Sequence, residues 1–195
     1  MHVEFINKPV SGKYPEKHFG NITPNCLWVK FTDDENEWVG SFETGWVKDA
    51  KLIFQLQNHK AFIIANGHGC LIDFNLKEQI NESVISHIES ALLNAVNDTI
   101  YFIDGFDIKY VNSDGSVDVL LSDYNFDKII LIKIKDNKLY AKYWHYQANT
   151  NSFNFEIDLI TKEVKDSFYI EEKQMNTDKP KIGLVDRIKN YFNKS

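Results

Sequence analysis

The chain has 195 residues, a formal net charge of −6 and a hydrophobic content of 43%. A chain of this length and hydrophobicity can bury a full core, and its aromatic content of 14% favours β-sheet. Arginine is the side chain that best recognises phosphates and bases, and the sequence has only Arg187 and is acidic overall, so we expect no nucleic-acid binding.

The N-terminal sequence MHVEFINKPV lacks the charged region and the long apolar region of a secretory leader. No apolar run approaches the ~18 residues of a membrane span. Cys26 and Cys70 are too few for a disulfide framework, and we expect them to be reduced, packed thiols. These features together predict a cytoplasmic protein without a membrane partner.

The first part of the chain predicts short strands separated by turns. Residues 2–6 are expected to form an edge strand, and residues 7–25 are rich in turn-forming Pro and Gly. Further strands are predicted near 27–32 and 37–42. The acidic segment between them, Asp33-Asp34-Glu35-Asn36-Glu37, lacks the spacing and the internal glycine of a calcium-binding loop. We interpret this segment as a solvated turn.

Residues 51–80 alternate apolar and polar side chains and predict three strands joined by two turns. The turns are expected at Asn58-His59 and at Gly67-His68-Gly69. His68 close to Cys70 suggests, as an alternative, a thiol–imidazole dyad, but no third group that would orient it is evident. A zinc site is disfavoured because no second pair of ligands stands at zinc-binding spacing.

Two segments have the apolar spacing of a helix. In residues 81–97 the apolar side chains recur three or four apart, which predicts an amphipathic helix that Asn81 or Ser83 would cap. Residues 182–192 show a similar spacing after the polar segment 171–181, and predict a C-terminal helix that docks on the protein's own core.

The second half of the chain again predicts mostly strands. They are expected near residues 99–103, 106–111, 116–121, 129–135, 138–146 and 153–160. The sequence Asn112-Ser113-Asp114-Gly115 predicts a tight turn between two of them.

The two halves resemble each other. Residues 54–62 and 132–140 match in character position by position at an offset of 78, and the match continues on both sides with gaps in predicted turns. We interpret this pattern as a duplication, with a first repeat and helix at 1–98 and a second at 99–195, packed as one compact unit. The predicted fold is mainly β, with two pseudo-repeated antiparallel β-sheets and two amphipathic helices, arranged as a sandwich or in a partial-propeller-like way.

Negative charge is concentrated in one region. Residues 98–127 contain seven aspartates against a single lysine, Lys109, a local charge of −6 that equals that of the whole chain. A localised negative field attracts basic partners and speeds their encounter. The alternative is that most of these aspartates stabilise turns.

The chain is acidic and β-rich, lacks a leader, and carries Trp28, Trp38, Trp46 and Trp144 together with this run of aspartates. In these respects it resembles bacterial immunity proteins, the toxin-neutralising antidotes of contact-dependent inhibition and polymorphic toxin systems. The resemblance concerns general character and not a motif, so it assigns no residue a role. It implies a monomer that binds one basic, nuclease-type toxin domain and blocks its active site, without enzymatic activity, cofactor or metal.

Two groups of side chains are candidates for such a contact, because acidic groups steer a basic partner and aromatic groups anchor it. The first group comprises Asp33, Asp34, Glu35, Glu37 and Trp38. The second group comprises Asp104, Asp107, Asp114 and Asp118.

Two other function classes remain open from the sequence. One is a small-ligand-binding or scaffold β-domain that uses Tyr140, Tyr143 and Tyr146 as a platform, although ordinary cross-strand packing also explains these tyrosines. The other is a hydrolase that uses Cys70 with His68, or paired carboxylates such as Asp104 and Asp107.

Overall fold

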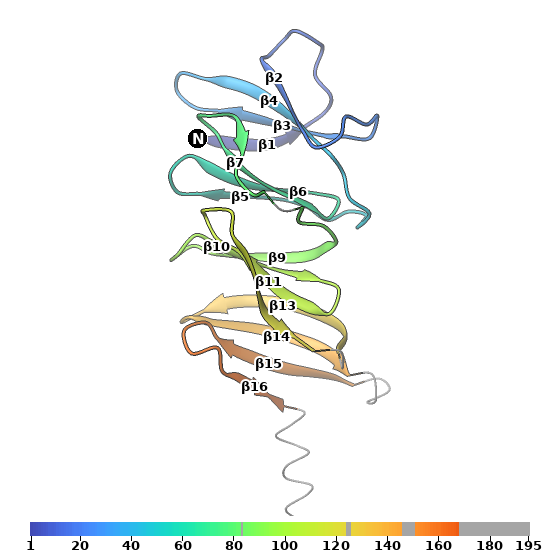
Figure 1. Cartoon of the computed structure of the whole chain (residues 1–195), viewed down its shortest axis with the longest axis vertical. Helices are drawn as coiled ribbons and strands as arrows, with labels where there is room; N and C mark the ends of the chain where they lie inside the picture. The colour runs from blue at the N-terminus through green and yellow to red at the C-terminus, as the bar shows by residue number, and fades with distance from the viewer. Residues whose placement is uncertain (83, 124–125, 146–150, 168–195) are drawn as a thin grey trace, which may run out of the picture.

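The protein is a stack of four antiparallel-rich β-sheets, each of four strands (Figure 1). This computed structural model describes residues 1–82, 84–123, 126–145 and 151–167. Within these ranges the chain is almost entirely strand and turn, so the predicted mainly-β class is confirmed. The sheets follow one another along the longest axis of the molecule in chain order (Figure 1).

The strand bounds show that each sheet uses a separate stretch of chain. Sheet 1 comprises β1 (His2–Ile6), β2 (Glu16–Phe19), β3 (Leu27–Thr32) and β4 (Glu37–Phe42), in the order β1-β3-β4-β2. Sheet 2 comprises β5 (Lys51–Leu56), β6 (Lys60–Ala65), β7 (His68–Asp73) and β8 (Glu78–Gln79), in chain order. Sheet 3 comprises β9 (Ile88–Asn94), β10 (Thr99–Asp104), β11 (Asp107–Val111) and β12 (Val117–Ser122), again as consecutive neighbours. Sheet 4 comprises β13 (Phe126–Lys135), β14 (Lys138–His145), β15 (Ser152–Asp158) and β16 (Val164–Asp166).

Three apolar layers hold the four sheets together, one between each pair of neighbours. Strand β6 contributes side chains to two of these layers. Ala61, Ile63 and Ala65 belong to the layer shared with sheet 1, whereas Phe62 and Ile64 belong to the layer shared with sheet 3. Successive side chains of a strand point to opposite faces, so a strand buried on both faces must be continuously apolar.

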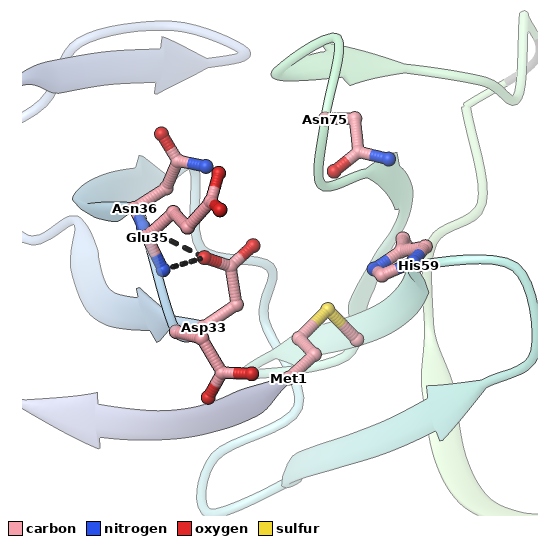
Figure 2. Close-up of a pocket in the computed structure, with 7 residues that line it drawn as sticks. Met1, Asp33, Glu35, Asn36, His59 and Asn75 are labelled. Atoms are coloured by element: carbon pink, nitrogen blue, oxygen red, sulfur yellow. Dashed lines mark hydrogen bonds between the residues drawn. The ribbon is translucent and has the colours of Figure 1, made fainter.

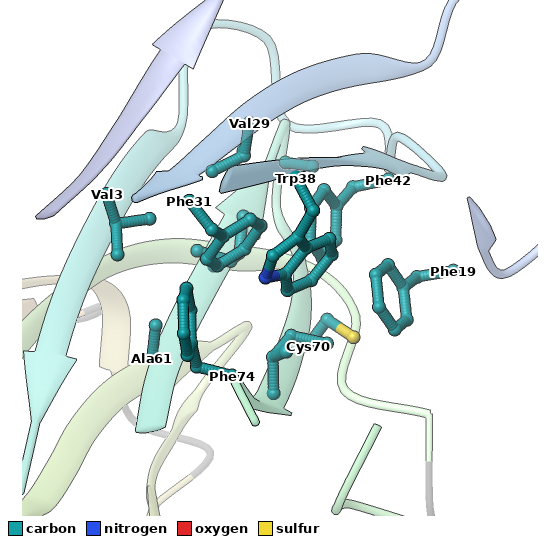
Figure 3. Close-up of a cluster of buried hydrophobic side chains, with 12 residues drawn as sticks. Val3, Phe19, Val29, Phe31, Trp38, Phe42, Ala61, Cys70 and Phe74 are labelled. Atoms are coloured by element: carbon teal, nitrogen blue, oxygen red, sulfur yellow. The ribbon is translucent and has the colours of Figure 1, made fainter. Parts of the chain in front are cut away.

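The layer between sheets 1 and 2 is rich in aromatic rings (Figure 3). Trp38 stacks on Phe31 with ring centroids 4.1 Å apart, and Phe19 stacks on Phe42 at 4.8 Å. The first stack joins the two strands of the β3–β4 hairpin and the second joins the parallel neighbours β2 and β4, and such close ring contacts are favoured by dispersion forces.

The similarity between the two halves has a structural counterpart in sheets 2 and 4. The β5–β6 turn places Asn58 and His59 at φ 54° and 56°, and the β13–β14 turn places Asp136 and Asn137 at φ 52° and 57°. Such left-handed pairs reverse the chain tightly, in a two-residue turn between Lys135 and Lys138 and in a three-residue connection between Leu56 and Lys60. The predicted turns at these residues are therefore confirmed.

The last turn of each sheet, β7–β8 in sheet 2 and β15–β16 in sheet 4, repeats the same hydrogen bonds. In sheet 2 the side chain of Asp73 accepts from the backbone N–H groups of Asn75 and Leu76, both at 2.9 Å. In sheet 4 Asp158 accepts from Ile160 and Thr161 at the same distance. The pattern Ile-Asp-Phe and Ile-Asp-Leu thus encodes one turn used twice.

The prediction of two sheets with two helices is wrong in its number of sheets, since four are present in the described ranges. The helix predicted at 81–97 is also wrong. Residues 88–94 form β9, which pairs with β10 across a turn that contains the proposed repeat boundary at residue 98. Strand β9 contributes Ile88 and Ala91 to one apolar layer and Leu92 to the next, and apolar residues on both faces of a strand imitate helical spacing. The helix predicted at 182–192 lies outside the described residues.

Two smaller expectations also differ. Strand β2 lies in the segment that we expected to be rich in turns and for which we predicted no strand, and it pairs in parallel with β4. The second turn of sheet 2 is formed by Asn66 and Gly67, at φ 50° and 84°, so His68 and Gly69 already belong to β7. Among the described residues, no helix is long and apolar enough to cross a membrane.

Candidate functional site

The first predicted group of acidic residues borders a hollow between sheets 1 and 2, which we name the acidic pocket. It has a volume of about 360 Å³ and is lined by Met1, Asp33, Asp34, Glu35, Asn36, His59 and Asn75. The β3–β4 turn supplies the acidic wall, and the β5–β6 and β7–β8 turns supply the opposite wall with His59 and Asn75 (Figure 2). Residues far apart in sequence meet here because the turns of stacked hairpins emerge on the same side of the molecule.

Asp33 shapes the acidic wall and does not project freely. Its carboxylate accepts hydrogen bonds from the backbone N–H groups of Glu35 at 2.9 Å and Asn36 at 2.7 Å (Figure 2). The hydrogen bond from Glu35 is the main reason why the pKa of Asp33 is lowered, since these bonds favour the ionised carboxylate. The predicted solvated turn is present, and Asp33 is the residue that fixes its conformation.

Two carboxylates of this wall are left for an outside partner. Asp34 and Glu35 are exposed, and neither carboxylate has a hydrogen bond or ion pair within the part of the chain that the structure describes. Glu37, in contrast, forms an ion pair with Lys30 of the neighbouring strand. The pocket therefore offers two uncompensated negative charges beside an imidazole and an amide.

Trp38 does not belong to the surface. It is fully buried in the layer between sheets 1 and 2, and its ring stacks on that of Phe31 (Figure 3). The expectation that it anchors a partner is wrong, because a residue on the inward face of β4 contacts sheet 2 and not solvent. Trp46, in the β4–β5 connection, is the exposed tryptophan of this region at 89% exposure.

The second predicted group is not one site. Asp104 and Asp107 flank the β10–β11 turn and share Lys109, whose Nζ lies 2.6 Å and 3.9 Å from their carboxylates. Asp114 lies in the β11–β12 turn, at the other end of the five-residue strand β11. At about 3.4 Å per residue, β11 separates the two turns by roughly 17 Å.

Asp114 and Asp118, the other members of the second group, differ in their surroundings. Asp114 accepts a hydrogen bond from the Ser116 hydroxyl at 2.7 Å and one from the Ser116 backbone N–H at 2.9 Å, and the hydroxyl bond is the larger cause of its lowered pKa. Asp118 stands exposed on the edge strand β12, opposite Tyr110. Among these aspartates, the explanation that they stabilise turns applies to Asp114.

The surroundings of Cys70 do not favour the alternative of a thiol–imidazole dyad with His68. Cys70 is buried in the layer between sheets 1 and 2, where burial raises the pKa of its thiol. A nucleophilic cysteine needs the opposite, a lowered pKa and access to substrate. Within the described ranges, no group of three or more His, Cys, Asp or Glu side chains is arranged to hold a metal ion.

The tyrosine platform is divided between two faces of sheet 4. Tyr143 is fully buried and its hydroxyl donates to Asp166 at 2.7 Å, whereas Tyr140 lies on the outward face. Tyr146 lies outside the described residues. Alternation along β14 explains the division, because Tyr140 and Tyr143 are three positions apart.

A second cavity, of about 210 Å³, lies over the outer face of sheet 1 and was not predicted. Its lining includes His18, Cys26, Trp28 and Ser41, and the Nδ1 atom of His18 lies 2.5 Å from the Ser41 hydroxyl. The signal was missed because β2, which carries His18, is a short and largely polar strand without a clear alternation.

No family model matches this chain, and no curated protein matches it in sequence. The function must therefore be argued from the surfaces described above.

Proposed function

We propose that this protein is a non-enzymatic binding protein, an immunity protein that neutralises a basic, nuclease-type toxin domain through the acidic pocket. The observation that carries the proposal is the pair of exposed carboxylates, Asp34 and Glu35, which have no partner within the described residues and border a hollow of about 360 Å³. A lysine or arginine side chain of a partner fits such a hollow and would supply the missing charge.

The pocket is suited to a tight contact because its acidic wall is held in advance. The two hydrogen bonds to Asp33 fix the β3–β4 turn, so that little conformational freedom is lost when a partner binds. A wall of this kind can present its carboxylates where a nuclease would otherwise hold phosphate oxygens. This is the physical basis on which we propose inhibition by occupation of the active site.

Electrostatics favours a basic partner at long range as well. The formal charge of the chain is −6, and the two unpaired carboxylates stand on an exposed turn. Charges of this kind raise association rates, and salt screens them over about 10 Å at 0.1 M. We propose a monomer that binds its toxin one to one.

The proposal is tested by capture with a charge-reversed control. The full chain and the double variant Asp34→Lys/Glu35→Lys are used as baits in lysate of the source cells, beside Glu89→Lys/Glu163→Lys as a matched variant with exposed carboxylates elsewhere. A basic protein captured by the wild type and the matched variant, but not by the pocket variant, is then assayed for nucleic-acid cleavage. Loss of cleavage when the captured protein is mixed with the full chain at equimolar ratio supports the proposal. The proposal is refuted if the pocket variant captures the protein as well as the wild type does, or if cleavage persists in the mixture.

A second candidate function rests on the cavity of sheet 1. Hydroxyl, imidazole, thiol and indole groups surround about 210 Å³, a composition that suits a small polar ligand. The test is tryptophan fluorescence during titration with sugars and nucleotides. A saturable change that is lost in Trp28→Phe but kept in Trp46→Phe supports this function, and no saturable change removes it.

A further inference from the structure

The outer face of sheet 4 carries the opposite charge from the rest of the protein. Residues directly opposite each other in a ladder point to the same face, and the pairs Lys128–Trp144, Ile130–Lys142, Lys133–Tyr140 and Lys135–Lys138 alternate with pairs whose side chains lie in the apolar layer. Six lysines thus share the outward side, which we name the lysine face: Lys128, Lys133, Lys135, Lys138, Lys142 and Lys165.

Two carboxylates stand opposite these residues in the ladder, and a third, Asp136 of the β13–β14 turn, lies 3.9 Å from the Nζ atom of Lys135. Glu156 is opposite Tyr140 and lies 2.8 Å and 3.7 Å from the Nζ atoms of Lys138 and Lys165. Asp158 is opposite Lys138 and is engaged in its turn by backbone N–H groups. With these three carboxylates counted, the six lysines leave a formal charge of +3, on a chain whose formal total is −6.

Two aromatic rings are set into this face on the central strand β14. Tyr140 and Trp144 are partly exposed, lie four positions apart, and are therefore separated by about 13 Å, with Lys142 between them. The Nζ atom of Lys133 lies 5.0 Å from the centre of the Tyr140 ring, and that of Lys128 lies 5.8 Å from the Trp144 ring. A lysine ammonium group thus lies over the face of each ring, where a stacking base would take its place.

We propose that the lysine face binds single-stranded nucleic acid without sequence preference. Lysines neutralise the phosphates of a strand laid across a β-sheet, and exposed aromatic rings stack on its unpaired bases. The face contains no arginine fork that would read base edges, so binding is expected to tolerate any sequence. The whole-chain charge predicted no such binding because it averages two faces of opposite sign.

An acidic polypeptide is the rival occupant, since lysines attract carboxylates as well as phosphates. The aromatic rings favour nucleic acid, because bases present flat π-faces at every step of a strand and carboxylates do not. A terminal sheet also needs a polar outer face for solubility, but charges of either sign would serve that purpose. The proposal stands apart from the acidic pocket, which belongs to sheets 1 and 2.

The test is titration of a fluorescein-labelled oligothymidylate with the full chain, followed by anisotropy at several salt concentrations. The logarithm of the binding constant should fall with the logarithm of salt, with a slope of about −0.7 for each phosphate contacted. Trp144→Ala and Tyr140→Ala should each weaken binding by roughly five-fold to a hundred-fold, the effect of removing one stacking platform. Lys133→Glu/Lys142→Glu should weaken binding further and flatten the salt slope.

The matched control is Lys17→Glu/Lys51→Glu, which reverses two exposed lysines on sheets 1 and 2. Far-UV circular dichroism on every variant establishes that each remains folded. The proposal is overturned if the oligonucleotide does not bind, if the control weakens binding as much as the face variants do, or if polyglutamate binds more tightly than the oligonucleotide. Duplex DNA that binds as tightly as the single strand would remove the stacking role of Tyr140 and Trp144.

Discussion

The apolar layer between sheets 2 and 3 gives a sharp test of the stacked arrangement. The Phe62 side chain lies in this layer and is fully buried. Its ring covers Gly69 so closely that a Cβ atom on Gly69 would lie 2.6 Å from the Phe62 Cζ atom. Phe62→Ala removes this ring and leaves a cavity that the backbone of two packed sheets cannot fill.

The expected loss follows from burial and cavity formation. Transfer of a fully buried phenylalanine contributes about 1.5–3 kcal/mol, and the residual cavity brings the cost of truncation to about 3–5 kcal/mol. For a protein of this size the corresponding fall in Tm is roughly 6–20 °C. Urea unfolding followed by circular dichroism measures this loss.

Phe106→Ala is the matched control, because Phe106 lies in the β10–β11 turn and is 49% exposed. Its truncation should change the free energy of unfolding by no more than about 0.5 kcal/mol. A loss of under about 1 kcal/mol for Phe62→Ala would refute the continuous layer between sheets 2 and 3.

Three further predictions concern the acidic pocket and the cysteines. With an identified basic partner, Asp34→Lys/Glu35→Lys should lower the association rate about ten-fold or more at low salt and flatten its salt dependence; stopped-flow rates that match those of Glu89→Lys/Glu163→Lys would exclude the pocket. The pKa of Asp33 is lower in the folded protein than its unfolded value of about 4, so its ionised form stabilises the fold above that pH, and this contribution is lost as pH falls through the lower folded value. Asp33→Asn should therefore lose less Tm than the wild type between neutral and acidic pH. An equal loss of Tm in the two proteins contradicts this role. An alkylating reagent should modify Cys26 at least about ten-fold faster than Cys70, whose thiol is buried and has a raised pKa. Equal modification rates measured by mass spectrometry would show that the apolar layer between sheets 1 and 2 opens readily.

Local patterns predicted most of the strands because alternation and turn chemistry are both local. The hairpin around Asn58-His59 and the turn at Asn112–Gly115 follow from residues that tolerate left-handed backbone angles. The number of sheets could not be predicted from these patterns, because alternation shows that a strand has an apolar face but not which element covers that face. Strand β6, apolar on both faces, was the available sign that sheet 2 lies inside a stack.

The candidate site was predicted in part for the same reason. An acidic run between two strands is visible in sequence, so the wall of the acidic pocket was found, whereas His59 and Asn75 join it only through the stacking of turns. Trp38 was assigned to the surface because an isolated tryptophan beside an acidic loop gives no indication of which face it occupies. The lysine face was missed because its lysines are spread over three strands and gather on one side only through the ladder register.

The stack also predicts how stability is distributed along the chain. Among the described residues each sheet packs against its sequence neighbours, so that there sheets 2 and 3 have apolar layers on both faces, whereas sheets 1 and 4 have one. In such nearest-neighbour architectures the ends open at lower free energy than the middle. Backbone amides of β6 and β10 should therefore exchange with solvent more slowly than those of β3 and β14, which are interior strands of the terminal sheets. Comparing only interior strands separates the effect of stacking from that of a sheet edge. Native-state hydrogen exchange in which all four strands share one opening free energy would show a single cooperative unit, and the order of opening inferred from the layers would be wrong.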